Sequence, residues 1–242
     1  NLNLLSSFRR LSELGDCREL VIREKPISPA IWCGMFSGKT YEEHGHDSFV
    51  AAGEIVRREH IKVDFIWDIL HGQGKRVYVL NVPFVVPPYC FNVDFKPVGF
   101  GLPTNEEEWQ EELERVTAKT GELLSLKPDL LISVYTLLDR VQHFHWGEDV
   151  VLEWYRRLDA KIDELLFKSG FLEDKTNGLI VVSDHGFCSF GEAKVQTLPR
   201  ETEQGVIKGD HHENALLITV NVKHRIGSPQ DVFHAIRDYF SL

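Results

Sequence analysis

The sequence has few cysteines and none of the close pairs that hold zinc ribbons or small disulfide scaffolds. Its 242 residues include four cysteines, Cys17, Cys33, Cys90 and Cys188, and no two of them form a C-x-x-C pair. Dense disulfides are typical of small secreted domains, whereas isolated cysteines suit reducing compartments. We therefore expect a cytoplasmic protein whose fold does not depend on cross-links.

Long apolar runs are also missing. No stretch reaches the roughly 18 residues that are needed to cross a bilayer. The first ten residues lack the order of charged, apolar and small residues that marks a signal peptide. These features predict that the protein does not associate with a membrane.

Basic residues are in the minority. The chain has 27 lysines and arginines against 37 aspartates and glutamates, which gives a net charge of −10. Proteins that bind nucleic-acid polymers usually carry a basic stripe, so this balance argues against such a partner. An anionic substrate would need local positive charge, and bound metal cations are the obvious source.

What the chain does contain is an alternation of apolar strands and amphipathic helices, with 43% apolar residues. The pattern predicts strands near 18–23, 76–80, 129–135, 178–183 and 216–220, and helices near 4–14, 28–38, 60–72, 106–126, 137–144, 150–168 and 230–240. We expect one α/β domain over residues 1–242, a three-layer α/β/α sandwich with a largely parallel central sheet. The proline- and glycine-rich stretch near 82–105 is expected to be a loop-rich insertion.

Two polar side chains follow the strand predicted at 178–183. Residues 178–182 are apolar without alternation, which is typical of a strand buried on both faces of a parallel sheet. Asp184 and His185 come directly after them. Ligands of open α/β sheets bind beyond the carboxyl ends of the strands. The pair is therefore either a plain Asx turn or part of a metal site.

Two further segments offer metal-type ligands. In the helix predicted at 137–144, Asp139 and His143 are four residues apart and share one face, as a helix-stabilising pair or as two ligands of one metal. His145 falls off that face and is expected to be a packing or supporting residue. His211 precedes the strand at 216–220, in a solvated loop or as the third protein ligand of a tetrahedral site. After the strand at 178–183 we expect a polar loop to Lys208.

Ser28 is predicted to cap the N-terminus of the helix at 28–38, with Pro29 at the first helical position and Gly38 just past its end. A serine at this place is either a simple cap or a group set where helix N–H groups favour a phosphate.

In this order, four segments resemble the alkaline phosphatase superfamily. The resemblance is closest to its type I phosphodiesterase/nucleotide pyrophosphatase branch, and there to prokaryotic, often archaeal, phosphohydrolase-like proteins. The segments are the helix 28–38 with His44-Gly45 behind it, Asp-Arg-Val-Gln-His at 139–143, Ser-Asp-His-Gly-Phe at 183–187, and Gly-Asp-His at 209–211. In the family's nucleophile helix a Thr or Ser stands ten residues before a glycine, as Ser28 stands before Gly38.

The resemblance implies a two-metal phosphoesterase that acts on small phosphate esters. Asp139, His143 and His211 would hold one divalent ion, and Asp184 and His185 a second, together with the Ser28 oxygen. Zn²⁺ is the expected metal and Mn²⁺ the second candidate. Such ions clamp the attacking and leaving oxygens at phosphorus, and Ser28 would form a phospho-serine intermediate.

The sequence also departs from the family pattern. The family begins with a strand ending in an Asp that binds the second metal, and we expect that strand to be absent here. Phe49 stands about where nucleotide pyrophosphatases place a phosphate-binding Asn. Ser28 lacks the Pro and Arg of a sulfatase motif. The alternatives to a phosphodiesterase are a degenerate, non-catalytic metal-binding member of the fold and a phosphomonoesterase or phosphomutase.

Overall fold

The computed structural model describes residues 4–84, 88–98 and 105–242, which form two compact units. One unit comprises residues 1–26 and 138–225, and the other comprises residues 27–137 and 226–242. Part of the insertion predicted near 82–105 lies outside the described residues, and its described part contains the strand β5 (Tyr89–Phe91). That the whole chain folds as one domain stays a prediction.

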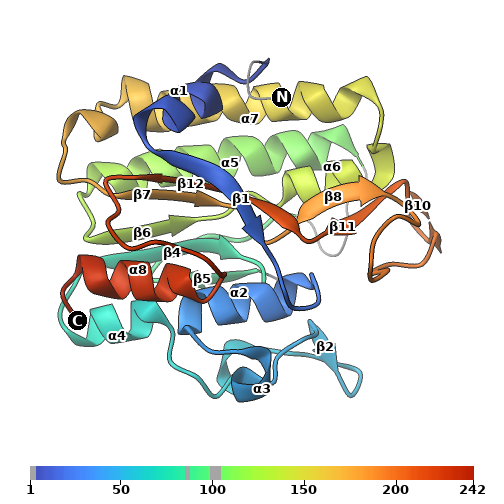
Figure 1. The fold of residues 1–242 in the computed structure, drawn as a ribbon, viewed down its shortest axis with the longest axis horizontal. Coiled ribbons are helices and arrows are strands. Elements are labelled where there is room, and N and C mark those ends of the chain that lie inside the picture. Colours follow the sequence, from blue (N-terminus) through green and yellow to red (C-terminus); the bar gives the residue numbers. More distant parts are fainter. Residues whose placement is uncertain (1–3, 85–87, 99–104) are drawn as a thin grey trace. The chain divides into compact units, whose positions relative to one another are not determined.

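The first unit is built on a three-stranded antiparallel sheet (Figure 1). Its strands are β1 (Asp16–Val21), β12 (Asn214–Val220) and β7 (Leu179–Val182), with β12 in the centre. Helix α1 (Ser6–Leu14) lies against β1 and β12 and beside the long helix α7 (Asp149–Ile162). Helix α7 continues as a π-helix over Asp163–Lys168, and a 3-10 turn follows over Phe171–Glu173.

A buried carboxylate fixes the start of α1. Asp159 of α7 is 6% exposed, and it accepts hydrogen bonds from the backbone N–H groups of Ser7 and Phe8 at 2.9 and 3.0 Å. The N-cap residue itself, Leu5, has no side chain that could do so. Asp159 therefore supplies the acceptor that the free N–H groups of this helix end require.

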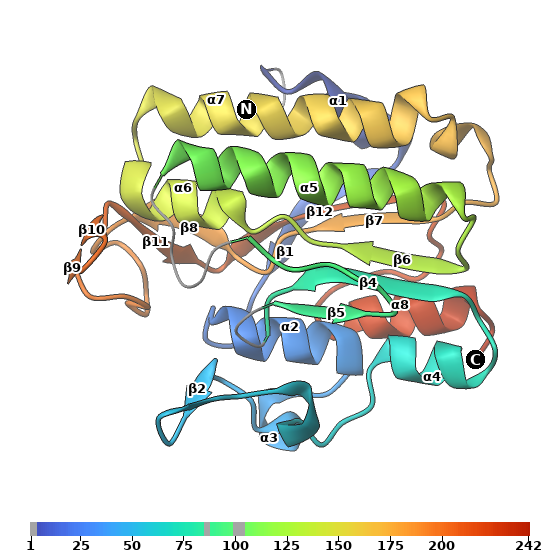
Figure 2. The same ribbon diagram turned by 180° about the vertical axis from the view of Figure 1, so that it is seen from behind.

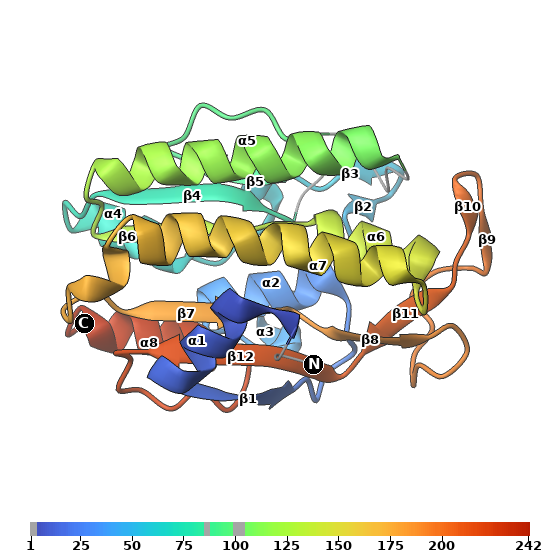
Figure 3. The same ribbon diagram turned by 90° about the horizontal axis from the view of Figure 1, so that it is seen from above.

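Strands β7 and β12 pair at the base of one long hairpin (Figure 3). Beyond β7 the chain continues into β8 (Gly186–Ser189), which pairs antiparallel with β11 (Gly209–His212). The chain then returns along β12. Between β8 and β11 a small hairpin of β9 (Glu201–Thr202) and β10 (Gly205–Val206) projects from the ladder.

This hairpin corrects two predictions. The segment after residue 183 is not a loop throughout, because β8 occupies its beginning. Strand β7 is half-buried rather than buried on both faces, and its partner β12 runs antiparallel to it. The reversal between β8 and β11 brings the chain back in the opposite direction, which an apolar run cannot reveal.

The second unit has three layers within itself (Figure 2). Its sheet has the order β5-β4-β6, where β4 (Val77–Val82) is parallel to β6 (Leu130–Ser133) and antiparallel to β5. Helix α5 (Glu106–Ser125) covers one face, and the other face carries α2 (Ser28–Ser37), α4 (Ile66–Gly72) and α8 (Asp231–Tyr239). Smaller elements complete it: α3 (Tyr41–His44), the pair β2 (Val50–Ala51) and β3 (Glu54–Ile55), and a 3-10 turn over Arg58–His60.

The α/β class is thus confirmed, and the parallel sheet is confirmed only in part. Among the strand pairings of the described residues, β4–β6 is the parallel one. Most helix and strand positions agree closely with expectation, and α6 (Leu137–His145) covers the helix predicted at 137–144. The helix predicted at 60–72 begins only at Ile66. No helix among the residues placed by the structure combines the length and apolar character of a membrane span.

The ends of α2 agree with expectation at one side and differ at the other. Gly38 has the left-handed φ of 69° and donates its N–H to Gly34 O at 2.9 Å, as predicted for a residue just past the helix. At the start, Ser28 is the first helical residue and Ile27 is the N-cap, so Ser28 is not the cap. Pro29 is then the second helical residue, still in the first turn, where a proline is tolerated.

The tight turn between α1 and β1 gives a test of packing. A Cβ on Gly15 would lie 1.9 Å from the backbone oxygen of Thr219, so Gly15→Ala must push the turn away from β12. We expect the free energy of unfolding in urea to fall by about 1–3 kcal/mol, as for other overpacked sites. Gly72→Ala is the control. Gly72 is also a glycine at the end of a helix, but a Cβ added there would meet no atom within 4 Å. Equal stability of the two variants would contradict the packing argument.

Candidate metal centre

Three elements of the first unit bring the predicted metal ligands together. Helix α6 carries Asp139 and His143, His185 stands between β7 and β8, and His211 lies on β11. The β8–β11 ladder sets the register, because His211 is paired with Phe187 and His212 with Gly186. Gly186 is required there, since a Cβ would lie 2.1 Å from the Asn214 oxygen.

One carboxylate oxygen is the centre of the cluster. Asp139 Oδ1 lies 3.3 Å from His211 Nε2, 3.5 Å from His143 Nε2 and 3.6 Å from His185 Nε2. Within the described part of the chain this buried atom has no hydrogen-bond partner of ordinary geometry. About a third of the Asp139 side chain is exposed, which leaves an approach from solvent.

The three imidazoles direct their Nε2 atoms inward because backbone carbonyls hold their Nδ1 atoms. His143 Nδ1 donates to Gly209 O at 3.0 Å, His211 Nδ1 to Pro26 O at 2.8 Å, and His185 Nδ1 to Gly186 O at 3.0 Å. A carbonyl can only accept, so each Nδ1 carries a proton and each neutral ring presents an Nε2 lone pair. This second contact is the one that metal-binding histidines usually make.

Such an arrangement requires a positive charge at its centre. The Nε2 atoms of His143 and His211 are 3.1 Å apart, and both would present lone pairs toward Asp139. A proton between them or a metal cation removes the repulsion. The donor set of imidazole nitrogens and a carboxylate oxygen suits Zn²⁺ and also Mn²⁺. The residues present therefore fit a divalent metal.

The charges and the burial of the cluster shift the pKa values of Asp139, His211 and His185. Burial raises the pKa of the Asp139 carboxyl, but the nearby His143, His211 and His185 outweigh burial and hold that pKa well below its usual range. For His211, burial lowers the pKa but the Asp139 carboxylate outweighs it and leaves the pKa raised. Burial lowers the pKa of His185 and dominates there. The cluster thus keeps Asp139 ionised and favours a single cation beside it.

Aromatic packing holds the imidazoles in place. The rings of His185 and His211 stack with their centroids 3.5 Å apart. Phe187 lies against all three histidines, with centroids 5.0 Å from His143 and 5.5 Å from the other two. The sequence indicated the ligands, but this support and the three carbonyl contacts went unpredicted. Backbone carbonyls leave no signal in a sequence.

Asp184 joins the cluster through His185, whose Nε2 lies 3.4 Å from Asp184 Oδ2. Asp139, His185 and His211 form one group of potential ligands whose coordinating atoms all lie within 4.8 Å of one another. The structure therefore gathers all five predicted ligands but does not separate them into two sets. Their division between two ions stays a prediction.

The sequence also singled out His145 and Ser28. His145 interacts with Glu148, with its Nδ1 2.7 Å from Glu148 Oε2. Ser28 opens α2 in the second unit and is half-buried there. Its role as nucleophile stays a prediction.

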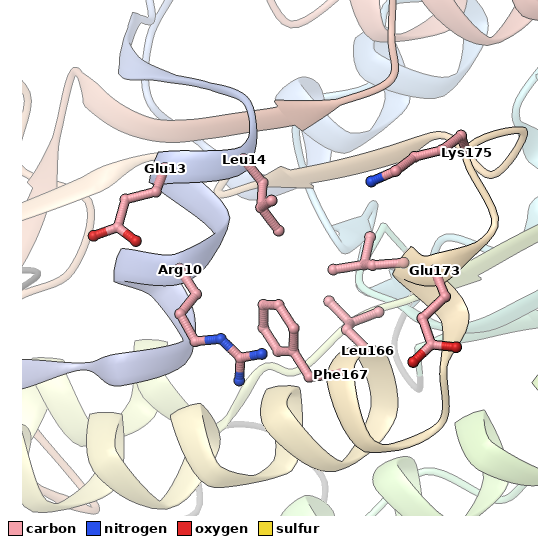
Figure 4. A pocket seen from close by; sticks show the side chains of 8 residues that line it. Arg10, Glu13, Leu14, Leu166, Phe167, Glu173 and Lys175 are labelled. Atoms are coloured by element: carbon pink, nitrogen blue, oxygen red, sulfur yellow. The ribbon is translucent and has the colours of Figure 1, made fainter.

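A hollow of about 550 Å³ occurs elsewhere in the first unit (Figure 4). Its apolar wall is made by α1, the π-helix and the following turn, and charged side chains surround it. The lining residues are Arg10, Glu13, Leu14, Leu166, Phe167, Leu172, Glu173 and Lys175. None of the five predicted ligands lines this hollow, so the chemistry indicated by the sequence does not belong to it.

Comparison with solved structures places the fold. The mouse ectonucleotide pyrophosphatase/phosphodiesterase 5, solved as an inactive variant with AMP, matches with a TM-score of 0.66 at 13% identity, over 100% of this chain and 91% of that one. The human protein of the same name matches with a TM-score of 0.60 at 12% identity, over 98% and 90%. At these identities the likeness shows the fold alone.

Phosphonoacetate hydrolase from Sinorhizobium meliloti, solved with phosphonoformate, matches with a TM-score of 0.54 at 15% identity. The match covers 77% of this chain, which spans about half (52%) of the hydrolase. These neighbours confirm the predicted alkaline-phosphatase-like fold. No curated protein sequence matches the chain.

The sequence itself matches the family model described as type I phosphodiesterase / nucleotide pyrophosphatase over residues 26–241. That span includes helix α2 and all five predicted ligands, and it confirms the resemblance inferred from the motifs. The chain belongs to the type I phosphodiesterase / nucleotide pyrophosphatase family.

Proposed function

We propose that the protein is a metal-dependent phosphoesterase that hydrolyses phosphodiester or nucleotide pyrophosphate-type bonds through a phospho-serine intermediate. The observation that carries the proposal is the convergence of three imidazole Nε2 atoms on the buried Asp139 Oδ1. Family membership supports the reaction class. The solved neighbour that holds AMP supports a small phosphate-ester substrate.

Five of the residues would be metal ligands and one would be the nucleophile. Asp139, His143 and His211 would hold one ion, and Asp184 and His185 a second, with Zn²⁺ favoured and Mn²⁺ as the other candidate. When bound, the ions supply positive charge that stabilises the phosphoryl oxygens and lowers the pKa of a nearby hydroxyl. The carbonyl contacts of the three histidines direct their Nε2 atoms toward the ion, and each neutral ring presents its Nε2 lone pair there.

Ser28 would attack phosphorus. Its Oγ forms a new P–O bond while the bond to the leaving alcohol or phosphate breaks, and water then cleaves the phospho-serine. As the first residue of the ten-residue helix α2, Ser28 stands where the helix dipole favours a phosphate.

Metal binding gives the first test. Metal-free protein should bind about two Zn²⁺ ions in calorimetry, as a two-metal phosphoesterase requires. Mutating a residue that only hydrogen-bonds to a metal ligand typically lowers metal affinity ten- to hundredfold. Asp139 would bind the metal directly, so Asp139→Asn should weaken binding by more than about 100-fold. His60→Gln, at an exposed histidine outside the cluster, should leave affinity unchanged. A stoichiometry of one or none would favour the non-catalytic alternative.

The nucleophile assignment has a separate test. Ser28→Ala should lower the kcat for an aryl phosphodiester by more than about 1,000-fold, as expected for loss of a covalent nucleophile, with metal content unchanged. Ser37→Ala, at the other end of α2, is the control and should retain turnover. Undiminished turnover in Ser28→Ala would show that Ser28 is not the nucleophile.

A further inference from the structure

We propose that Glu112 is a positioning residue for the metal ligands on α6, acting through the N-terminus of that helix. The inference rests on the proposed function, because it concerns the metal that Asp139 and His143 would hold. Glu112 belongs to α5, 24 residues before Thr136, and no sequence pattern linked it to the site.

Glu112 is a buried carboxylate that faces the start of α6. Its side chain is 1% exposed. Its Oε1 accepts the N–H of Thr136 at 2.5 Å and the N–H of Leu137 at 3.0 Å. The Thr136 hydroxyl lies 3.0 and 2.9 Å from the two carboxylate oxygens and donates to the carboxylate. One side chain therefore satisfies three donors at the beginning of the helix.

The Glu112 carboxylate caps the N-terminus of α6. The first N–H groups of a helix have no partner within it, and burying them unpaired is costly. The Thr136 hydroxyl, which could cap α6, is instead turned toward Glu112. The negative charge also lies at the positive end of the helix dipole. Removing it leaves these N–H groups without their acceptor and loosens the first turn of α6.

The segment leading into α6 is held from two sides. From α5, Thr117 Oγ1 lies 3.0 Å from the Tyr135 hydroxyl, and Thr120 Oγ1 lies 2.6 Å from Ser133 Oγ. From β4, the Asn81 amide donates to Val134 O at 3.0 Å. These contacts hold β6 and the connection. The Glu112 contacts reach the helix itself.

The ligands follow immediately. Asp139 stands in the first turn of α6, and His143 lies one turn further on the same face. A metal site tolerates displacements of only about 0.5 Å in its ligands. Loosening of the first turn of α6 would therefore displace Asp139 before His143.

The chain offers a matched control in Asp159. It is also a buried carboxylate on a neighbouring helix, and it also accepts two backbone N–H groups at the start of a helix. The helix that it caps, α1, carries none of the predicted ligands. A role in stability alone would make Glu112 and Asp159 equivalent.

The experiment compares Glu112→Gln with Asp159→Asn. Both should lower the midpoint of urea unfolding. Zn²⁺ calorimetry on the folded, metal-free proteins should show affinity reduced about tenfold for Glu112→Gln, the loss typical of residues that hold metal ligands in place. For Asp159→Asn it should stay within about twofold of wild type.

Should Glu112→Gln fail to fold, Thr136→Val takes its place. That change removes the hydroxyl that donates to the carboxylate and keeps the β-branched shape, and it should weaken Zn²⁺ binding by at least about threefold. Wild-type affinity in the variant tested, or an equal loss in Asp159→Asn, would overturn the role of Glu112 alone. A wild-type protein that binds no Zn²⁺ would overturn this inference together with the proposed function.

Discussion

Electrostatic repulsion among the polar atoms around Asp139 is the constraint on which the site depends. Three ring nitrogens approach one buried carboxylate oxygen, and two of them are 3.1 Å apart. A fold reaches such an arrangement only if other contacts hold the groups against their repulsion. Here backbone carbonyls hold the rings by Nδ1, and Phe187 packs against all three. A bound cation would relieve the repulsion that these contacts otherwise have to overcome.

Much of the site could be predicted because side-chain spacing on regular elements is readable. Asp139 and His143 lie one helical turn apart, so their common face followed from the helix prediction. Gly38 marked a helix end that the structure places at the same residue. The acid and imidazole after strand β7 stood out because an apolar strand has no structural need for them.

Other features had no local signal. The apolar run of β7 suits parallel and antiparallel partners equally, so the direction of β12 could not be inferred. Strand β8 begins with a glycine and follows two charged or polar groups, which concealed its pairing with β11. The start of α6 is capped by Glu112 from a distant helix, although Thr136 stands at the position where a local cap is usual. Contacts between segments far apart in sequence decided each of these cases.

The long hairpin from β7 to β12 has a consequence for variation of the chain. His185 and His211 stand on its two arms, and the pairing of Phe187 with His211 fixes their separation. The excursion between Ser189 and Gly209 leaves the ladder and re-enters it at the same rung, whatever its length. Insertions or deletions at the tip, near the β9–β10 hairpin, can therefore remodel the surroundings of the centre without displacing either histidine. The ladder separates the part of the hairpin that must stay constant from the part that is free to diversify.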